Sequence, residues 1–230
     1  MTEAKVPVLT IDGPSGSGKG TVGQILAQRL GWHFLDSGAL YRALGVAADR
    51  VRVDLGNQAA LARLAVDMDI HFTPGIDGDS VAVMLNGEEV GSVLRTEESG
   101  RRASILAAIP DVRRALLQKQ HSFRQSPGLV ADGRDMGSTV FPDALLKIYL
   151  TASPEVRAAR RYKQLKEKGF DVNLRRLLDE IRERDARDAG REVSPLKPAH
   201  DACILDTSQL DISGVVEHVQ GLLQERQGLR

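Results

Sequence analysis

The segment that most constrains this chain is Gly13-Pro14-Ser15-Gly16-Ser17-Gly18-Lys19-Gly20-Thr21. An apolar run at residues 6–11 precedes it and predicts a buried strand, and apolar residues at helical spacing follow it from Val22 to Leu30. Glycines allow backbone N–H groups to approach an anion closely, and the first turn of the following helix adds partial positive charge. The pattern Gly-x-x-x-x-Gly-Lys between a strand and a helix therefore predicts a loop that binds the phosphates of a nucleotide, with Lys19 as its mobile cation.

This loop departs from the usual pattern directly after the lysine. The Ser or Thr expected there is replaced by Gly20, and the hydroxyl comes one position later, at Thr21. That hydroxyl ordinarily binds magnesium, so we expect Mg²⁺ to enter with the triphosphate rather than on a protein ligand. Asp12 and Asp132, each directly after a predicted strand, are candidates for ordering water around the metal. A glycine-rich turn that binds nothing is the alternative, and it requires strand, spacing, lysine and helix to coincide by chance.

Composition restricts the class of protein further. The chain has 230 residues, enough for one substantial core, and equal numbers of basic and acidic residues, 31 each. This balance gives no support for binding a nucleic-acid polymer or a membrane surface. Arginine outnumbers lysine, which suits bidentate recognition of phosphates. The single cysteine, Cys203, excludes an internal disulfide and is predicted to be a small buried side chain. No apolar run reaches the length of a membrane span, and we expect a cytoplasmic monomer.

Short apolar runs recur at residues 6–11, 32–35, 129–131, 145–150 and 202–205, and helical patterns separate most of them. Strands that alternate with helices predict an α/β fold with a parallel sheet covered on both faces. Between residues 68 and 94 the period changes to two, with Val81, Val83 and Leu85 alternating before Asn86-Gly87, a dipeptide typical of hairpin turns. We expect an antiparallel insert here, on a small subdomain that also includes a helical stretch at residues 101–124.

Two further helices are predicted after residue 150. Ser153-Pro154 is a typical helix start, with a capping residue before a proline at the first helical position. Arg157, Arg160 and Arg161 share a face of this helix, and the pattern fits a solvated surface as well as a lid over a triphosphate. In the next helix, residues 177–180 resemble the metal-binding end of a strand. Their helical period and charged neighbours lead us to reject them as a metal site.

Three polar segments are candidates for a second binding site. Residues 36–42 and 132–135 each follow a predicted strand, and ligands of open parallel sheets bind at that edge. A helix cap and a simple Asp-Gly turn are the respective alternatives. Arg184, Asp188 and Arg191 are spaced to share one helix face, where a ladder of ion pairs is the alternative. Alongside a phosphate-binding loop, such arginines would supply the cations that phosphoryl transfer needs.

These segments together resemble the bacterial-type cytidylate kinase family, within the P-loop nucleoside monophosphate kinases, over nearly the whole chain. The resemblance is carried by residues 11–21, by Leu35-Asp36-Ser37-Gly38-Ala39-Leu40-Tyr41-Arg42, by Asp132-Gly133-Arg134-Asp135-Met136-Gly137 with Val140-Phe141-Pro142, and by residues 183–191. It implies a P-loop three-layer fold, with a central parallel five-stranded sheet flanked by helices and a small antiparallel insert. It also implies a single kinase domain over residues 1–230, with a monophosphate-binding region at 37–126, the insert near 68–94 and a lid at 154–171.

The resemblance further implies transfer of the γ-phosphate of ATP to CMP or dCMP, with Mg²⁺ accompanying ATP. The implied ATP-binding residues are residues 13–21, Arg157, Arg160 and Arg161. The implied CMP-binding residues are Ser37, Tyr41, Arg42, Ser104, Arg113, Asp132, Arg134, Asp135, Arg184, Asp188 and Arg191. Within this set, the cytosine is assigned to Ser104, Arg113 and Asp135, the sugar to Arg184 and Asp188, and the acceptor phosphate to Arg42, Arg134 and Arg191. Lys19, Arg134 and Arg191 are the implied catalytic residues.

Other classes remain as alternatives at this point. A related kinase could act on UMP or on a non-nucleotide acceptor such as shikimate. A nucleotide-binding regulator of the GTPase kind would need an Asn-Lys-x-Asp motif, and none of Asn57, Asn86 and Asn173 is followed by lysine. A nucleic-acid-binding ATPase is disfavoured by the neutral charge and by the lack of a strand-borne Asp-Glu pair.

Overall fold

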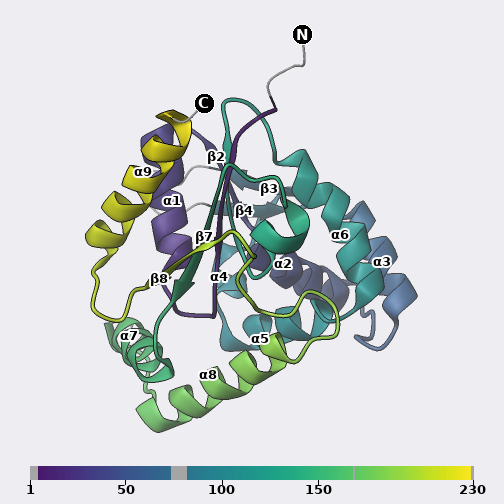
Figure 1. Ribbon diagram of the computed structural model, residues 1–230. Coiled ribbons are helices and arrows are strands. Elements are labelled where there is room, and N and C mark those ends of the chain that lie inside the picture. The colour runs from purple at the N-terminus through teal and green to yellow at the C-terminus, as the bar shows by residue number, and fades with distance from the viewer. Residues whose placement is uncertain (1–4, 74–81, 168, 229–230) are drawn as a thin grey trace.

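The computed structural model describes residues 5–73, 82–167 and 169–228. At the centre of this part of the chain is a parallel sheet in the order β2-β6-β1-β7-β8 (Figure 1). Its strands are β1 (Val8–Asp12), β2 (His33–Asp36), β6 (Leu129–Gly133), β7 (Leu146–Thr151) and β8 (Cys203–Asp206). β1 lies between β6 and β7, so the loop that follows it leaves the middle of the sheet. The apolar runs form these strands, which confirms the predicted parallel α/β sheet.

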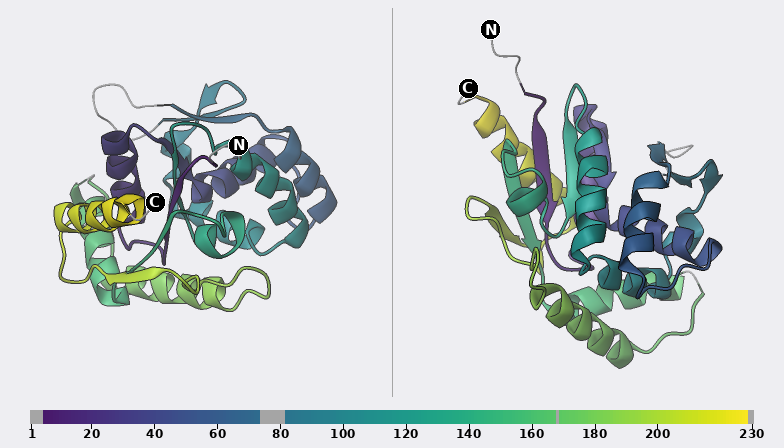
Figure 2. Two further views of the ribbon diagram at one scale, coloured as in Figure 1. Left: turned by 45° about the horizontal axis from the view of Figure 1, so that its top comes forward. Right: turned by 90° about the vertical axis from the view of Figure 1, so that its right-hand side faces the viewer.

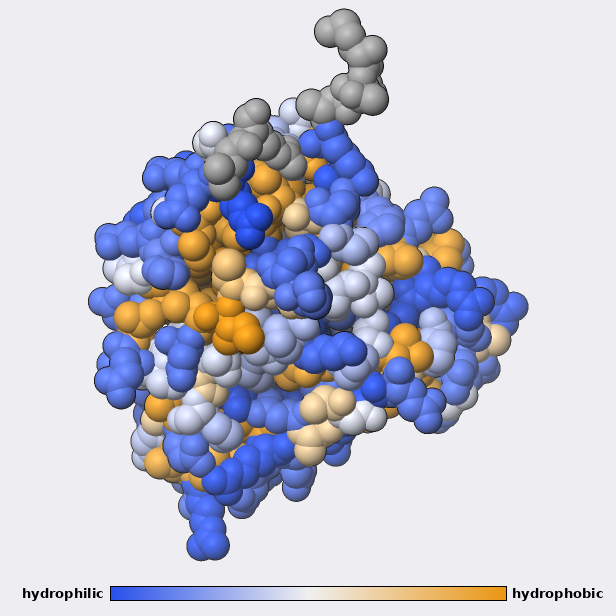
Figure 3. Space-filling model, viewed as in Figure 1, coloured by the Kyte–Doolittle hydropathy of each residue, from blue (hydrophilic) through white to orange (hydrophobic). Residues whose placement is uncertain are grey.

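Burial along the strands follows their place in the sheet. β1 and β6 are buried over their whole length because helices cover both faces. β8 is an edge strand, and Ile204 on it is 63% exposed. A hydrophobic patch over β8 is visible in Figure 3. Cys203 was predicted to be a small buried side chain. It packs against the core but is only partly buried, because an edge strand has a neighbouring strand on one side only.

One face of the sheet is covered by α1 (Lys19–Leu30) and α9 (Ile212–Gly228). Their apolar residues form one core cluster with β1, β6 and β7, including Leu26, Val216 and Ile148. α1 approaches β2 closely, since a Cβ added at Gly23 would lie 2.8 Å from Cε2 of Phe34. This packing holds the start of α1 against the sheet.

The other face carries α2 (Ser37–Arg50), α3 (Gln58–Asp67), α5 (Glu97–Leu106) and α6 (Pro110–Ser122), together with η2 (Met136–Val140), a short π-helix. Figure 2 shows this group of helices beside the sheet. Asp36 caps α2 by accepting the N–H of Ala39 at 3.0 Å. The predicted helical stretch at 101–124 is helical over most of its length. It is two helices, because the chain leaves helical geometry before Pro110, which begins α6.

A separate antiparallel sheet contains β3 (Ile70–Thr73), β4 (Ala82–Leu85) and β5 (Glu88–Glu89), as predicted. Leu85 pairs with Glu88 across Asn86-Gly87, whose φ angles of 50° and 83° are those that a two-residue hairpin turn requires. Val83 and Leu85 are buried, and Val81 lies outside the described residues. α4 (Gly91–Leu94) then leads back to α5.

α7 (Pro154–Glu167) and α8 (Leu174–Ala189) lie beyond the carboxyl ends of the strands (Figure 1). Ser153 Oγ accepts the N–H of Val156 at 3.2 Å, which confirms the predicted cap of α7. Asp179 and Glu180 lie on α8 rather than on a strand, as the helical period predicted. In the part of the chain that the structure describes, no helix is both long and apolar enough to cross a bilayer.

Candidate active site

The loop between β1 and α1 has a backbone that requires glycine. Gly16 and Gly18 have φ angles of 77° and 93°, and a Cβ at Gly13 would lie 2.0 Å from the carbonyl oxygen of Leu150. Thr207 Oγ1, just beyond β8, lies 3.3 Å from the carbonyl oxygen of Ser17 and donates to it. α1 starts at Lys19 with Gly18 as its N-cap, and no described side chain caps it. Its first N–H groups therefore remain available to an anion.

Lys19 lies inside this loop and is only 6% exposed. Its Nζ donates to the carbonyl oxygen of Pro14 at 3.0 Å and lies 3.9 Å from Oδ1 of Asp132. Burial and the nearby Arg134 lower the pKa of Lys19 to about 8. The ammonium group is therefore still mostly protonated at neutral pH.

Asp132, at the end of β6, lies beside the position where the usual hydroxyl is replaced by glycine. A Cβ at Gly20 would be 3.3 Å from Oδ2 of Asp132. Burial raises the pKa of Asp132 to about 7, although Lys19 acts in the opposite direction. The described residues contain no cluster of three or more His, Cys, Asp or Glu that could hold a metal ion.

Asp12 has a different environment from Asp132. Its Oδ1 accepts the N–H of Met136 and its Oδ2 accepts the N–H of Gly137, both at 2.8 Å. Both carboxylate oxygens are thus directed at η2 rather than at the loop. Of the two carboxylates predicted to order water around the metal, only Asp132 lies beside Gly20 at the start of α1.

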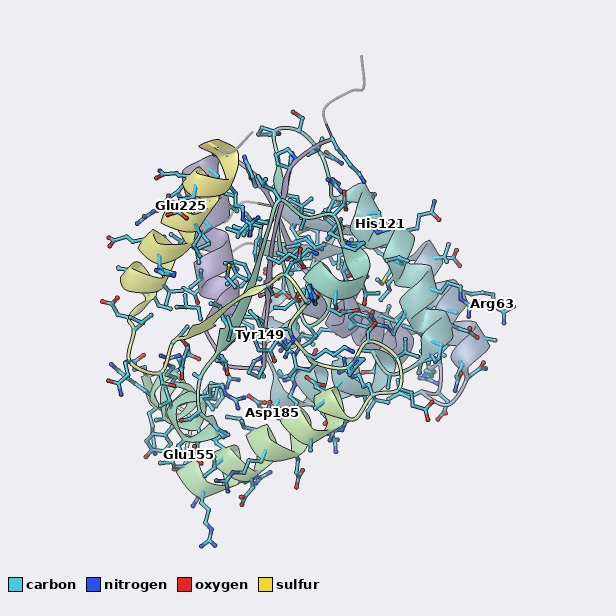
Figure 4. The ribbon with its side chains drawn as sticks, in the orientation of Figure 1. Arg63, His121, Tyr149, Glu155, Asp185 and Glu225 are labelled. Carbon is cyan, nitrogen blue, oxygen red and sulfur yellow. The ribbon has the colours of Figure 1, made fainter. Side chains whose placement is uncertain are left out.

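The three arginines of α7 lie near the phosphate loop but differ in burial and in their hydrogen-bond partners. Arg157 is buried, and its guanidinium donates to the carbonyl oxygens of Ser15 and Ala152 and to both oxygens of Asp185. Figure 4 shows Asp185 on the side of α8 that faces the sheet. Arg157 therefore supports the loop from within the protein, and it also lines the same cleft as Arg160 and Arg161. Its role toward ATP stays a prediction.

Arg160 and Arg161 reach toward opposite sides of the site. Arg160 donates to the carbonyl oxygen of Thr207 at 2.5 Å. Arg161 donates through Nε to Glu97 at 2.9 Å, which joins α7 to the start of α5. The three arginines of α7 line one cleft, and each has a different set of hydrogen-bond partners.

A second group of predicted residues meets around Asp135, at the start of η2. Asp135 forms a buried ion pair with Arg113 of α6. Arg113 also donates to Tyr41 Oη of α2 at 3.3 Å. Burial raises the pKa of Tyr41 to about 12, so this phenol stays neutral. A carboxylate and a guanidinium are therefore held side by side, and together they offer hydrogen-bond acceptors and donors to a heterocyclic base.

A third group surrounds Asp188 of α8, which is 1% exposed. Its Oδ1 accepts from Ser104 Oγ at 2.9 Å and from Arg191, and its Oδ2 accepts from Nε of Arg134 at 3.0 Å. Despite burial, the nearby Arg134 and Arg191 hold the pKa of Asp188 below its usual value. Arg191 was predicted to share a helix face with Asp188, which is wrong because α8 ends at Ala189. The two side chains pair nonetheless.

The remaining predicted residues lie between these groups. A Cβ at Gly100 would be 3.1 Å from Nη1 of Arg184 and 3.6 Å from Nη2 of Arg42, so both guanidinium groups lie against α5. Nε of Arg184 is buried with no hydrogen-bond partner among the described residues. Ser37 is buried against Gly133, where a Cβ would be 2.6 Å from Ser37 Oγ.

A cleft of about 1570 Å³ opens beside these groups. Its lining includes Lys19, arginines of α2, α7 and α8, and the apolar residues Leu210 and Ile212 before and at the start of α9. Among the described residues, the lining leaves out Arg134, Asp135 and Asp188, whose charges are paired within the protein.

Sequence reasoning missed Thr207, Asp185 and Glu97, which hold the loop and the arginines of α7. Thr207 directly follows β8, so the rule that ligands gather at the carboxyl edge could have indicated it. Asp185 and Glu97 lie on charged helix faces that resemble any solvated surface. Their role depends on partners far away in the sequence.

An anion-binding loop after the central strand of a parallel sheet, with a second group of arginines at the same sheet edge, is the arrangement of a P-loop enzyme suited to phosphoryl transfer. Comparison with known proteins narrows this class. A family model described as cytidylate kinase matches residues 9–225. The cytidylate kinase of Aeromonas hydrophila is 56% identical over 222 residues, 96% of each chain, and that of Pseudomonas paraeruginosa is 59% identical over 216 residues, 94% of each chain. This chain belongs to the cytidylate kinase family.

A solved structure agrees at the level of fold alone. An uncharacterized protein from Eubacterium ventriosum superposes with a TM-score of 0.51 at 10% identity, covering 95% of this chain and 98% of that chain.

Proposed function

We propose that this enzyme transfers the γ-phosphoryl group of ATP to CMP and dCMP, forming ADP with CDP or dCDP. The single observation that carries the proposal is the position of the carboxyl end of β6. Asp132 lies there beside the phosphate loop, while Arg134 and Asp135, close along the same chain, belong to the ion-paired groups on the other side. A donor at the loop and an acceptor at those groups would meet across this strand end.

The donor side is assigned to residues 13–21 with Arg160 and Arg161, and Arg157 holds the loop in place. Magnesium bound to ATP would neutralise phosphate charge, and Asp132 would order its water shell. Asp132 fits this role because its carboxylate faces the space left open by Gly20. Asp12 does not fit it, because both of its oxygens already accept backbone N–H groups.

The acceptor side is assigned to three groups. Arg42, Arg134 and Arg191 would hold the acceptor phosphate, with Ser37 and Asp132 beside it. Arg184 and Asp188 would contact the sugar. Ser104, Arg113 and Asp135, with Tyr41 behind Arg113, would face the cytosine. The cytosine amino group is a donor next to ring acceptors, so it suits a carboxylate beside a guanidinium, whereas uracil would invert that pattern.

The reaction needs no dedicated general base. The second pKa of a phosphate monoester is about 6, so the acceptor is mostly dianionic at neutral pH. One of its oxygens would attack the γ-phosphorus as the bond to the bridging oxygen of ADP breaks. Lys19 would exchange its bond to Pro14 for the phosphates, and with Arg134 and Arg191 it would stabilise the charge of the in-line transition state.

An ADP-release assay with ATP and a panel of CMP, dCMP, UMP, AMP, GMP and shikimate tests the proposal. We expect turnover with CMP and dCMP well above the other acceptors, and loss of turnover in Lys19→Ala with the fold retained. Turnover without preference for a cytidine acceptor, or activity of Lys19→Ala near that of the wild type, would contradict it.

A second assay examines recognition of the base. Asp135→Asn should lower the preference for CMP over UMP more than it raises the KM for ATP. Asp111→Asn is the matched control, because Asp111 forms an exposed ion pair with Arg114 on the same helix as Arg113. Equal losses for both acceptors in Asp135→Asn would count against contact between Asp135 and the base.

A further inference from the structure

The π-helix η2 directly follows Arg134 and Asp135, and it is held at its start by Asp12. Isolated π-helical turns are rare and often lie at functional sites, because they aim backbone and side chains in directions that an α-helix does not allow. The first N–H groups of a helix have no carbonyl partner within the helix. In η2 these groups belong to Met136 and Gly137, and each donates to one oxygen of Asp12. Asp12 is 4% exposed, so water does not compete effectively for these bonds.

Asp12 is attached to this segment at two places. Its backbone pairs with Gly133 in the register between β1 and β6. Its side chain holds Met136 and Gly137. Arg134 and Asp135 are the residues between these two attachments, so one aspartate restrains the chain on both sides of them.

The residue that follows Asp12 in the chain is Gly13, the first residue of the phosphate loop. Gly13 lies against the carbonyl oxygen of Leu150, which leaves no room for a side chain, because an added Cβ would be 2.0 Å from that oxygen. We propose that Asp12 is a positioning residue that fixes Arg134 and Asp135 for the acceptor, an inference that rests on the proposed function.

The far end of η2 has its own support. Nε2 of His121 lies 2.8 Å from the carbonyl oxygen of Val140, and Figure 4 shows His121 on α6. The ring of His121 also contacts Phe141, with centroids 5.6 Å apart. Loss of the Asp12 bonds should therefore loosen the first turn of η2 without unfolding the element.

The test compares Asp12→Asn with Thr10→Val. Asparagine keeps one acceptor oxygen but turns an amide N–H toward the second backbone N–H, and it removes the charge. Thr10 is the matched control, because it is buried on the same strand and its Oγ1 contacts the same turn of η2 but has no hydrogen-bond partner among the described residues. Valine keeps the shape of threonine.

For Asp12→Asn, losing a hydrogen bond to a charged group should raise the KM for CMP roughly tenfold and lower the preference for CMP over UMP, while the KM for ATP changes about twofold or less. Thr10→Val should keep the wild-type KM for CMP. A merely structural Asp12 would lower the melting temperature while leaving the KM for CMP unchanged, or would raise both KM values equally, and either result overturns the inference.

Amide hydrogen exchange in the wild type gives a measurement that does not depend on a folded variant. The amides of Met136 and Gly137 should exchange slowly in the free protein and more slowly still with CMP. Exchange as fast as in exposed loops would refute the inference. If the wild type prefers an acceptor other than CMP, the proposed function fails, and the effect of Asp12→Asn is then read on that acceptor.

Discussion

Arg157 offers the sharpest test of how the phosphate loop is supported. The structure predicts that Arg157→Met destabilises the fold and weakens ATP binding, although methionine is a good helix former of similar length. The guanidinium donates to the carbonyl oxygen of Ala152 at 2.9 Å and to that of Ser15 at 3.1 Å. It also donates to both oxygens of Asp185, at 3.1 and 2.5 Å. All of these bonds are lost together in the variant.

The expected magnitude follows from the burial of the two partners. Breaking a buried ion pair by removing one side costs about 3 to 5 kcal/mol, because the other charge remains buried and unpaired. The side chain of Arg157 is 3% exposed, but that of Asp185 is 24% exposed, so water can partly solvate the remaining carboxylate. We therefore expect a loss near the lower end, about 3 kcal/mol in the free energy of unfolding.

Urea unfolding of Arg157→Met and Arg161→Met provides the comparison. Arg161 lies on the same helix, but its ion pair with Glu97 is exposed, and such pairs contribute about 0 to 1 kcal/mol. Asp185→Asn in the Arg157→Met background should recover part of the loss, because it removes the unpaired charge. The reasoning is refuted if Arg157→Met costs no more than Arg161→Met, or if the second substitution recovers nothing.

Two further predictions concern stability. Gly23→Ala should destabilise the fold by about 1 kcal/mol, since overpacking against the ring of Phe34 outweighs the gain in helix propensity, and Phe34→Leu in that background should recover the loss on urea unfolding. Phe34→Leu made alone should not raise the free energy of unfolding above that of the wild type. Burial raises the pKa of Asp12 from 3.8 to about 6, opposed by its bonds to Gly137 and Met136. In this pH range the folded protein thus keeps a proton on Asp12 that the unfolded chain releases. As the pH rises from about 4 to about 6, the free energy of unfolding of the wild type should therefore decrease by about 3 kcal/mol more than that of Asp12→Asn. A pH-independent difference between the two proteins would contradict this.

Much of the fold could be predicted from local pattern. The apolar runs, the Asn86-Gly87 turn and the Ser153 cap each depend on residues adjacent in the chain, and all three appear where expected. The predictions that differ from the structure concern features that depend on tertiary packing rather than on neighbouring residues in the chain. Cys203 is only partly buried on an edge strand, and Arg191 lies beyond the end of α8.

In the candidate site, too, some features could be identified from local sequence and others only from the tertiary structure. The loop at residues 13–21 could be identified from sequence because glycine, lysine and helix spacing are local requirements of anion binding. The difference between Asp12 and Asp132 could not be identified, since both are aspartates directly after an apolar run. Only the tertiary structure shows that Asp12 accepts hydrogen bonds from η2 and that Asp132 lies beside Gly20.

By itself, the sequence determined that a phosphate loop lies in a parallel α/β sheet and that arginines gather at the same edge. Tertiary structure alone decided which of those charges remain available to a ligand. Arg157 became a buried support, Asp188 a shared partner of arginines, and Asp12 an acceptor of hydrogen bonds from η2. The reason is physical: the free energy of a charge depends on its desolvation and its partners, and those partners come from distant parts of the chain.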